Sequence, residues 1–293
     1  MNKSIRSICV LFFIFFFSFQ SAAYASDNKS FSQAAIASAH PLATQAGLNI
    51  LNQGGNAFDA AIAVTASLAV VEPYSSGIGG GGFYLLHQPL KDKYVMIDAR
   101  ETAPSRAHKD LYLDEAGKVK PGASINGALS AGIPGIPAAL VHLAEKYGKL
   151  KLSQSLAPAI VYAREGFPVD EYYQRMAGFR LKALQQNKAA SDIFLQQGEV
   201  PTLDHMIIQK DLAITLQKIA ASGFAGFYQG EVALKMVKDV ADHGGIWTEK
   251  DLSSYEVKER VPDITYYKGM KLVATSLPSS GGLVLTEILQ ILA

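Results

Sequence analysis

Residues 77–104 read GIGGGGFYLLHQPLKDKYVMIDARETAP, and this stretch decides the class of fold. Two apolar runs, Phe83–His87 and Tyr94–Ala99, flank a short polar segment that contains a proline. This pattern predicts a β-hairpin. The glycines of residues 77–82 form its entrance, and residues without a Cβ allow positive φ angles and the close approach of another backbone or a ligand. We therefore expect an antiparallel strand pair with a crowded, glycine-rich entrance.

Helices are predicted upstream of this hairpin. Pro41–Gln53 carries apolar residues at helical spacing and stops at a pair of glycines. Asn56 then has the character of a helix N-cap, with Asp59 three residues on, and opens an alanine-rich helix through Val71. This second helix has no charge after Asp59, which is typical of a segment buried on most sides.

Downstream of the hairpin, glycines end four more predicted helices, over residues 137–147, 153–165, 207–222 and 231–243. Tyr266–Ser276 indicates a turn followed by a strand. Strands at both ends with helices between them favour an α+β fold, with helices layered on a sheet, over a helical bundle. No proline- or serine-rich linker divides residues 26–293, so we expect a single domain there.

The N-terminus has the three parts of an export signal. Lys3 and Arg6 supply the positive charge, Ile8–Phe19 is almost entirely apolar, and small residues stand before Ser26. The apolar run is too short for a membrane span, which needs about 20 residues. Residues 1–25 are therefore predicted to be a cleaved signal peptide, and we expect a periplasmic or secreted protein with no membrane association after cleavage.

Composition excludes several classes of function. The 27 Lys and Arg residues nearly balance the 26 Asp and Glu residues, and no basic run stands out, so we expect neither a nucleic acid nor an anionic membrane surface as partner. The only cysteine, Cys9, lies in the predicted signal, which excludes a cysteine nucleophile, a zinc–cysteine site and a disulfide in the mature chain. A small neutral or zwitterionic partner is the better expectation.

Motifs for cofactors and common nucleophiles are missing. Gly77, Gly79 and Gly82 match the G-x-G-x-x-G pattern, but a helix precedes them and a strand follows, the reverse of a dinucleotide site. The six histidines have no metal-ligand spacing, and no G-x-S-x-G elbow is present. We therefore predict no metal site and no cofactor.

Arg100 is the candidate binding residue. It follows directly on the second strand of the hairpin, where a rigid scaffold can present a side chain to a pocket. A guanidinium can hold a carboxylate through two parallel hydrogen bonds. Asp98 and Glu101 are close enough in sequence to hold or neutralise it. A surface ion pair is the alternative from this segment alone.

The C-terminal end indicates a helix without a stop signal. Leu285, Ile288, Leu289 and Leu292 share one helical face, and neither a glycine cap, a basic last turn nor a proline follows them. This favours a sequence cut short over a helix that simply frays at its end.

Taken together, five segments resemble the large subunit of the γ-glutamyltransferases (γ-glutamyltranspeptidases). They are QGGNAFDAA at 53–61, GIGGGGF at 77–83, DARETAP at 98–104, GIPGIP at 132–137 and PSSGG at 278–282. They occur in order over nearly all of the chain after the signal. No single segment is specific, but the set is.

The resemblance implies an N-terminal nucleophile hydrolase with a four-layer αββα core, present here as an incomplete, large-subunit part. Such enzymes are exported as an inactive precursor that cuts itself into two subunits. A threonine at the start of the small subunit then attacks the γ-glutamyl amide of glutathione or a similar compound, and water or an amino acid takes the acyl group from the γ-glutamyl-enzyme. A threonine activated by its own amine is a known device for such attack.

Residue by residue, the resemblance assigns only Arg100, as the ligand of the γ-glutamyl α-carboxylate. The family's threonine would lie beyond Ala293, so we expect no catalytic residue in this chain, which alone would be inactive. Its partners would be γ-glutamyl compounds such as glutathione and the small subunit of the same precursor. The alternatives are an inactive remnant, an exported protein that only binds γ-glutamyl compounds, and an acylase on the same fold, such as a cephalosporin acylase.

Overall fold

The computed structural model describes residues 34–292, and contacts group Ile36–Ala293 into one compact unit. The predicted signal peptide and its cleavage before Ser26 lie outside the described residues, so the domain boundary there stays a prediction. Among the described residues, no helix has both the length and the apolar character that a membrane span requires.

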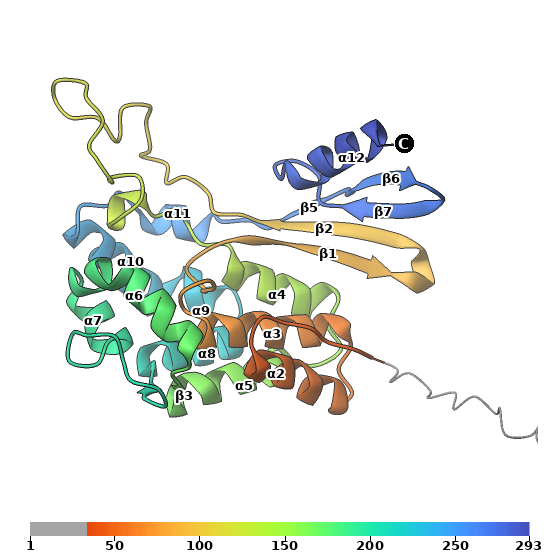
Figure 1. Cartoon of the computed structure of the whole chain (residues 1–293), viewed down its shortest axis with the longest axis horizontal. Helices are drawn as coiled ribbons and strands as arrows, with labels where there is room; N and C mark the ends of the chain where they lie inside the picture. The colour runs from red at the N-terminus through yellow and green to blue at the C-terminus, as the bar shows by residue number, and fades with distance from the viewer. Residues whose placement is uncertain (1–33, 293) are drawn as a thin grey trace, which may run out of the picture. The chain divides into compact units, whose positions relative to one another are not determined.

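The predicted hairpin is confirmed and forms two adjacent strands of a three-stranded sheet (Figure 1). Strand β1 (Gly82–Gln88) and strand β2 (Lys93–Ala99) are antiparallel neighbours, joined by the short 3₁₀ helix η1 (Pro89–Lys91). Strand β5 (Lys258–Arg260) comes from far along the chain and pairs antiparallel with the other edge of β2. Because β2 is the central strand, its last residues are fixed from both sides.

Six helices agree with the predicted ones: α2 (Pro41–Asn52), α3 (Ala57–Val71), α4 (Ile136–Lys146), α5 (Leu152–Glu165), α8 (Lys210–Ser222) and α10 (Gly230–Asp242). The predicted start of α8 was wrong. Ile207 is buried in strand β4 (Met206–Ile207), opposite Phe167 of strand β3 (Phe167–Pro168). Its apolar side chain matched the helical period, but pairing with Phe167 keeps it extended, and the helix begins after it.

Four helices of the described residues were not predicted from the sequence. A 3₁₀ turn, η2 (Ala128–Ser130), also lies before α4. Helix α6 (Glu171–Gln185) buries only Tyr173 and Ala177, so its apolar stripe is too narrow to give a clear period. The others are short: α7 (Lys188–Phe194), α9 (Ala225–Tyr228) and α11 (Glu249–Ser253). Contacts with the rest of the fold, and caps such as Asn187, sustain helices of this length.

The N-terminus of α3 shows how the helices are tied together. Asn56 caps this helix as predicted, and the buried Asp59 carboxylate accepts the Asn56 N–H at 2.8 Å in a capping box. The same carboxylate accepts the N–H groups of Lys149 and Leu150 at 3.0–3.2 Å. One acidic side chain thereby caps α3 and fixes the loop between α4 and α5. The burial predicted for α3 is also confirmed.

The C-terminal part forms a second strand pair and a helix. Strand β6 (Asp263–Tyr267) was not predicted and pairs with β7 (Met270–Ala274), which was. Helix α12 (Gly281–Ile291) contacts both strands. In Figure 1, these elements lie on the opposite side of β1 and β2 from helices α2–α5. The order helix, sheet, strand pair, helix agrees with the predicted α+β layering.

Candidate active site

Arg100 directly follows β2, as predicted, and its side chain is 55% exposed. The guanidinium lies over the ring of Phe83, 5.7 Å from its centre, and Arg100 Nε is 3.7 Å from Glu101 Oε2. Both contacts are long, and the pair with Glu101 is open to solvent, so they hold the guanidinium only weakly. Most of its N–H groups are therefore open to an incoming anion.

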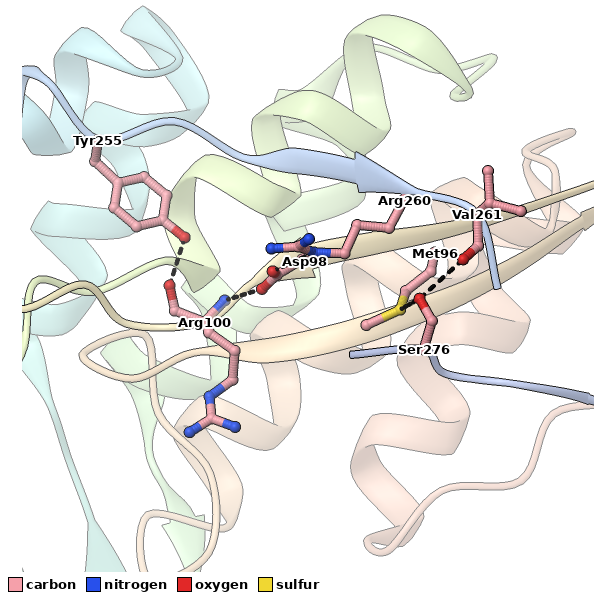
Figure 2. A network of polar contacts seen from close by, with 7 residues as sticks. All are labelled: Met96, Asp98, Arg100, Tyr255, Arg260, Val261 and Ser276. Carbon is pink, nitrogen blue, oxygen red and sulfur yellow. Dashed lines mark hydrogen bonds and ion pairs between the residues drawn. The ribbon is translucent and has the colours of Figure 1, made fainter. Parts of the chain in front are cut away.

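The backbone of Arg100 is held on both sides (Figure 2). Its N–H donates to Asp98 Oδ1 at 3.1 Å, and its carbonyl oxygen accepts the hydroxyl of Tyr255 at 2.8 Å. The main chain at this strand end is consequently fixed, while the side chain projects freely. This combination suits a residue that must present a charged group in a constant place.

Tyr255 belongs to a pair of stacked aromatic rings beside the strand end. Its ring lies parallel to that of Tyr228 at a centroid distance of 5.6 Å, and the Tyr228 hydroxyl donates to Pro134 O at 2.7 Å while accepting the Ala138 N–H at 3.2 Å. Burial raises the pKa of Tyr228 and of Tyr255 above the ordinary tyrosine value. Both phenols therefore stay protonated and can donate at neutral pH.

Asp98 is the second support of the strand end. It is only 7% exposed, and its Oδ2 accepts Arg260 Nε of strand β5 at 2.7 Å. The sequence suggested that Asp98 or Glu101 could hold or neutralise Arg100. In the structure Asp98 holds the backbone of Arg100 and pairs with Arg260, whereas Glu101 makes the loose contact with the Arg100 guanidinium.

The glycines of residues 77–82 are explained by the close approach of neighbouring backbone segments. None of residues 77–82 has a positive φ angle. A Cβ on Gly81 would lie 2.6 Å from Ala99 O and from Glu101 N, and one on Gly135 would lie 2.0 Å from Ala99 O. The Gly80 carbonyl accepts the N–H groups of Gly135 and Ile136 at the start of α4, at 2.9 and 3.1 Å. Glycines here let three backbones meet around the end of β2.

A cavity of about 430 Å³ lies beside this strand end. Its walls include Glu101, the backbone of Gly80 and Gly81, and side chains from the end of α3 and the loop after it, among them Thr65, Tyr74 and Ser76. Among residues 34–292, no three His, Cys, Asp or Glu side chains are grouped to hold a metal ion.

Sequence reasoning missed Tyr255 and Arg260. Both lie more than 150 positions downstream of the residues they hold, at separations of 155 from Arg100 and 162 from Asp98. Neither stands in a recognisable motif. The pairing of β5 with β2 brings Arg260 to the site, and Tyr255 lies just before β5, stacked on Tyr228.

The layered α+β fold agrees with the predicted N-terminal nucleophile hydrolase class, whose members include the structural neighbours described below. The family model described as Gamma-glutamyltranspeptidase matches residues 43–293, and the chain belongs to this family. The Glutathione hydrolase proenzyme of Bacillus subtilis (strain 168) is 39% identical over 258 residues, which cover 88% of this chain and 44% of the relative. The chain thus spans less than half the length of this relative.

Solved structures agree with the predicted fold. The crystal structure of Helicobacter pylori gamma-glutamyltranspeptidase matches with a TM-score of 0.86 and 39% identity, over 89% of this chain and 74% of that one. A cephalosporin acylase from Bacillus halodurans matches with a TM-score of 0.71 and 34% identity, over 80% of this chain and 44% of that one. The predicted family and its α+β fold are therefore confirmed.

Proposed function

We propose that this chain is the substrate-carboxylate-binding part of an exported enzyme that transfers or hydrolyses γ-glutamyl groups, with glutathione and related γ-glutamyl amides as substrates. The observation that carries the proposal is the Arg100 guanidinium, largely free on a backbone fixed by Asp98 and Tyr255. A bidentate guanidinium contact suits an amino-acid α-carboxylate. Family membership supplies the γ-glutamyl chemistry.

In the proposed reaction, the nucleophile is a threonine in the part of the relatives that this chain does not match. Its hydroxyl attacks the γ-carbonyl while its own α-amine takes the hydroxyl proton, and the leaving amine departs with a proton. The resulting ester, a γ-glutamyl-enzyme, is then broken by water or by an amino acid. Arg100 would hold the acyl group by its far carboxylate through both steps, and no metal or cofactor is required.

Exposed apolar side chains support a second polypeptide segment as partner. Leu285 and Ile288 of α12 and Ile264 of β6 are each more than two-fifths exposed. Exposed apolar side chains gathered on neighbouring elements are typical of a protein–protein interface. We propose that this surface packs against the small-subunit region of the same precursor.

Export, with cleavage before Ser26, follows from the predicted signal and can be checked by sequencing the N-terminus of the protein recovered outside the cytoplasm.

The decisive experiment joins residues 26–293 to the C-terminal half of the Bacillus subtilis relative, by co-expression or fusion, and follows hydrolysis of a γ-glutamyl anilide. Arg100→Lys keeps the charge but loses the two-bond geometry, so we expect apparent substrate binding to weaken by about 2–4 kcal/mol. Arg164→Lys, in an exposed pair with Glu165, is the matched control and should leave KM unchanged. No hydrolysis by the joined protein, or an unchanged KM for Arg100→Lys, would contradict the proposal.

A second function is favoured by the likeness to the cephalosporin acylase. Arg100 could equally hold an acyl group that has a terminal carboxylate but no α-amine. Comparing kcat/KM for a γ-glutamyl anilide with that for a glutaryl anilide, which lacks only the amine, separates the two functions. We expect the γ-glutamyl compound to be preferred, and a preference for the glutaryl compound would assign an acylase.

A further inference from the structure

At the same strand end, the Asp98 carboxylate could compete with a substrate carboxylate for the Arg100 guanidinium. Asp98 is the last but one residue of β2 and Arg100 directly follows the strand, so the two side chains start only two residues apart. The Asp98 carboxylate is buried, and its Oδ1 already accepts the Arg100 N–H at 3.1 Å. A buried carboxylate is costly unless it is paired with a cation. Arg100 would be a ready partner, and such a pair would occupy the group that should bind the substrate.

In the structure, Asp98 is paired with Arg260 instead. Its Nε lies 2.7 Å from Asp98 Oδ2, and Figure 2 shows the Arg100 guanidinium pointing away from the Asp98 carboxylate while Arg260 points toward it. In the register of β2 and β5, Asp98 is opposite Lys258, so Arg260 reaches it diagonally, two positions along. Because Arg260 makes this diagonal contact with Asp98, the Arg100 guanidinium is not paired with the Asp98 carboxylate.

The segment that carries Arg260 is anchored independently of Asp98. Neighbouring Glu259 accepts the Tyr147 hydroxyl at 2.8 Å and lies 2.9 Å from His142 Nε2, which ties β5 to α4. The Val261 carbonyl accepts the Ser276 hydroxyl at 2.8 Å. Because both flanking residues are held, the Arg260 side chain is delivered to Asp98 in a fixed position.

The local charges support the same interpretation. Lys258 lies opposite Asp98 in the register, but the ion pair to Asp98 comes from Arg260. Without Arg260 the buried carboxylate would lose its paired cation, and its negative charge would both draw in the Arg100 guanidinium and repel an approaching carboxylate.

We propose that Arg260 is a positioning residue for substrate binding, which pairs with Asp98 so that the Arg100 guanidinium stays free for the substrate's α-carboxylate. This inference rests on the proposed function. It predicts a specific defect when Arg260 is replaced by an uncharged side chain, and a specific rescue when the competing carboxylate is also removed.

The test uses the joined protein described above and two substrates, a γ-glutamyl anilide and the 4-aminobutyryl anilide that lacks only the α-carboxylate. In Arg260→Met, we expect KM for the γ-glutamyl compound to rise about tenfold or more, with kcat/KM for the 4-aminobutyryl compound changed less than about twofold. Arg260→Lys, which keeps a cation beside Asp98, should stay within about threefold of the wild type. The double variant Asp98→Asn/Arg260→Met should recover the wild-type KM, since the amide can still accept the Arg100 N–H.

A merely structural role for Arg260 would lower activity toward both substrates alike, through a smaller folded fraction, and that result would overturn the inference. So would a double variant as defective as Arg260→Met. A crystal structure of the Arg260→Met chain gives a readout without turnover, with the Arg100 guanidinium expected about 3 Å from the Asp98 carboxylate. A guanidinium that keeps its wild-type place would also overturn the inference. Failure of the proposed function can be told apart from failure of this inference, because in the first case the wild-type joined protein itself would lack γ-glutamyl activity.

Discussion

Two neighbouring regions of the sheet layers bury apolar surface to very different degrees. In β2 every residue from Val95 to Ala99 is buried, and α4 packs near the strand. In β6 and β7 no residue is buried, and Gly282 is the only buried residue of α12. The first region has a complete core of its own, whereas the second presents apolar side chains to solvent. The difference indicates that the stability of the fold resides in β1, β2 and the helices packed against them, and the proposed small-subunit region would cover the exposed C-terminal elements.

The largest expected effect compares one leucine from each region. Leu140 of α4 is fully buried, and Leu140→Ala should lower the free energy of unfolding by about 3–4 kcal/mol, because burial is lost and a cavity is left. Leu285→Ala on α12 removes the same atoms from an exposed position and should change it by less than about 0.5 kcal/mol. Urea denaturation of the chain measures both. Equal losses would show that α12 belongs to the same core.

The second prediction concerns association rather than stability. Ile288→Glu places a charge on the exposed apolar face of α12, so it should leave unfolding of the chain nearly unchanged but weaken binding to the C-terminal half of the Bacillus subtilis relative about tenfold or more. Isothermal titration of the separately expressed parts gives the dissociation constant. Glu287→Gln, a neighbouring exposed position, is the control. Binding that is equally tight for Ile288→Glu would place the interface elsewhere.

The third prediction returns to the well-buried region and to the site it supports. Tyr255→Phe removes the hydroxyl that donates to the Arg100 carbonyl at 2.8 Å, at a cost of about 1 kcal/mol. We expect KM for a γ-glutamyl anilide to rise about fivefold in the joined protein, with little change in kcat. Tyr266→Phe, on the exposed strand β6, serves as control. If both variants have the same KM, the Tyr255 hydroxyl has no part in placing Arg100.

The same contrast explains what could be predicted from the sequence. Local signals were sufficient for the β1–β2 hairpin, for the Asn56–Asp59 capping box and for the position of Arg100 at a strand end, because each depends on residues a few positions apart. Helix α6 was missed because it buries only Tyr173 and Ala177, too few to give a clear apolar period.

The supports of the site could not be predicted for a different reason. Arg260 meets Asp98 only once β5 has paired with β2, and Tyr255 meets Arg100 across 155 positions of the chain. The glycine-rich entrance could be predicted only in part. Its crowding was expected from the glycines alone, but which backbones meet at Gly81 and Gly135 depends on the approach of α4.

The smallest expected effect tests the anchor of β5 through pH. Burial acts to raise the pKa of Glu259, but hydrogen bonds from Tyr147 and His142, together with Lys146, outweigh it and hold the pKa below its ordinary value of 4.5. Since the pKa is lower in the folded than in the unfolded protein, the stabilisation is present above pH 4.5 and is lost as the pH falls through the folded-state value.

The advantage of the wild type over Glu259→Gln should therefore shrink in urea denaturation between about pH 6 and about pH 3. It should amount to less than about 1 kcal/mol even at the higher pH, because the group is partly exposed. For Glu256→Gln, an exposed residue of the same segment, the difference from the wild type should not vary in this way. An advantage that grows on acidification would mean that the Glu259 cluster does not hold β5 against α4, and the fixed delivery of Arg260 to Asp98 would then need another anchor.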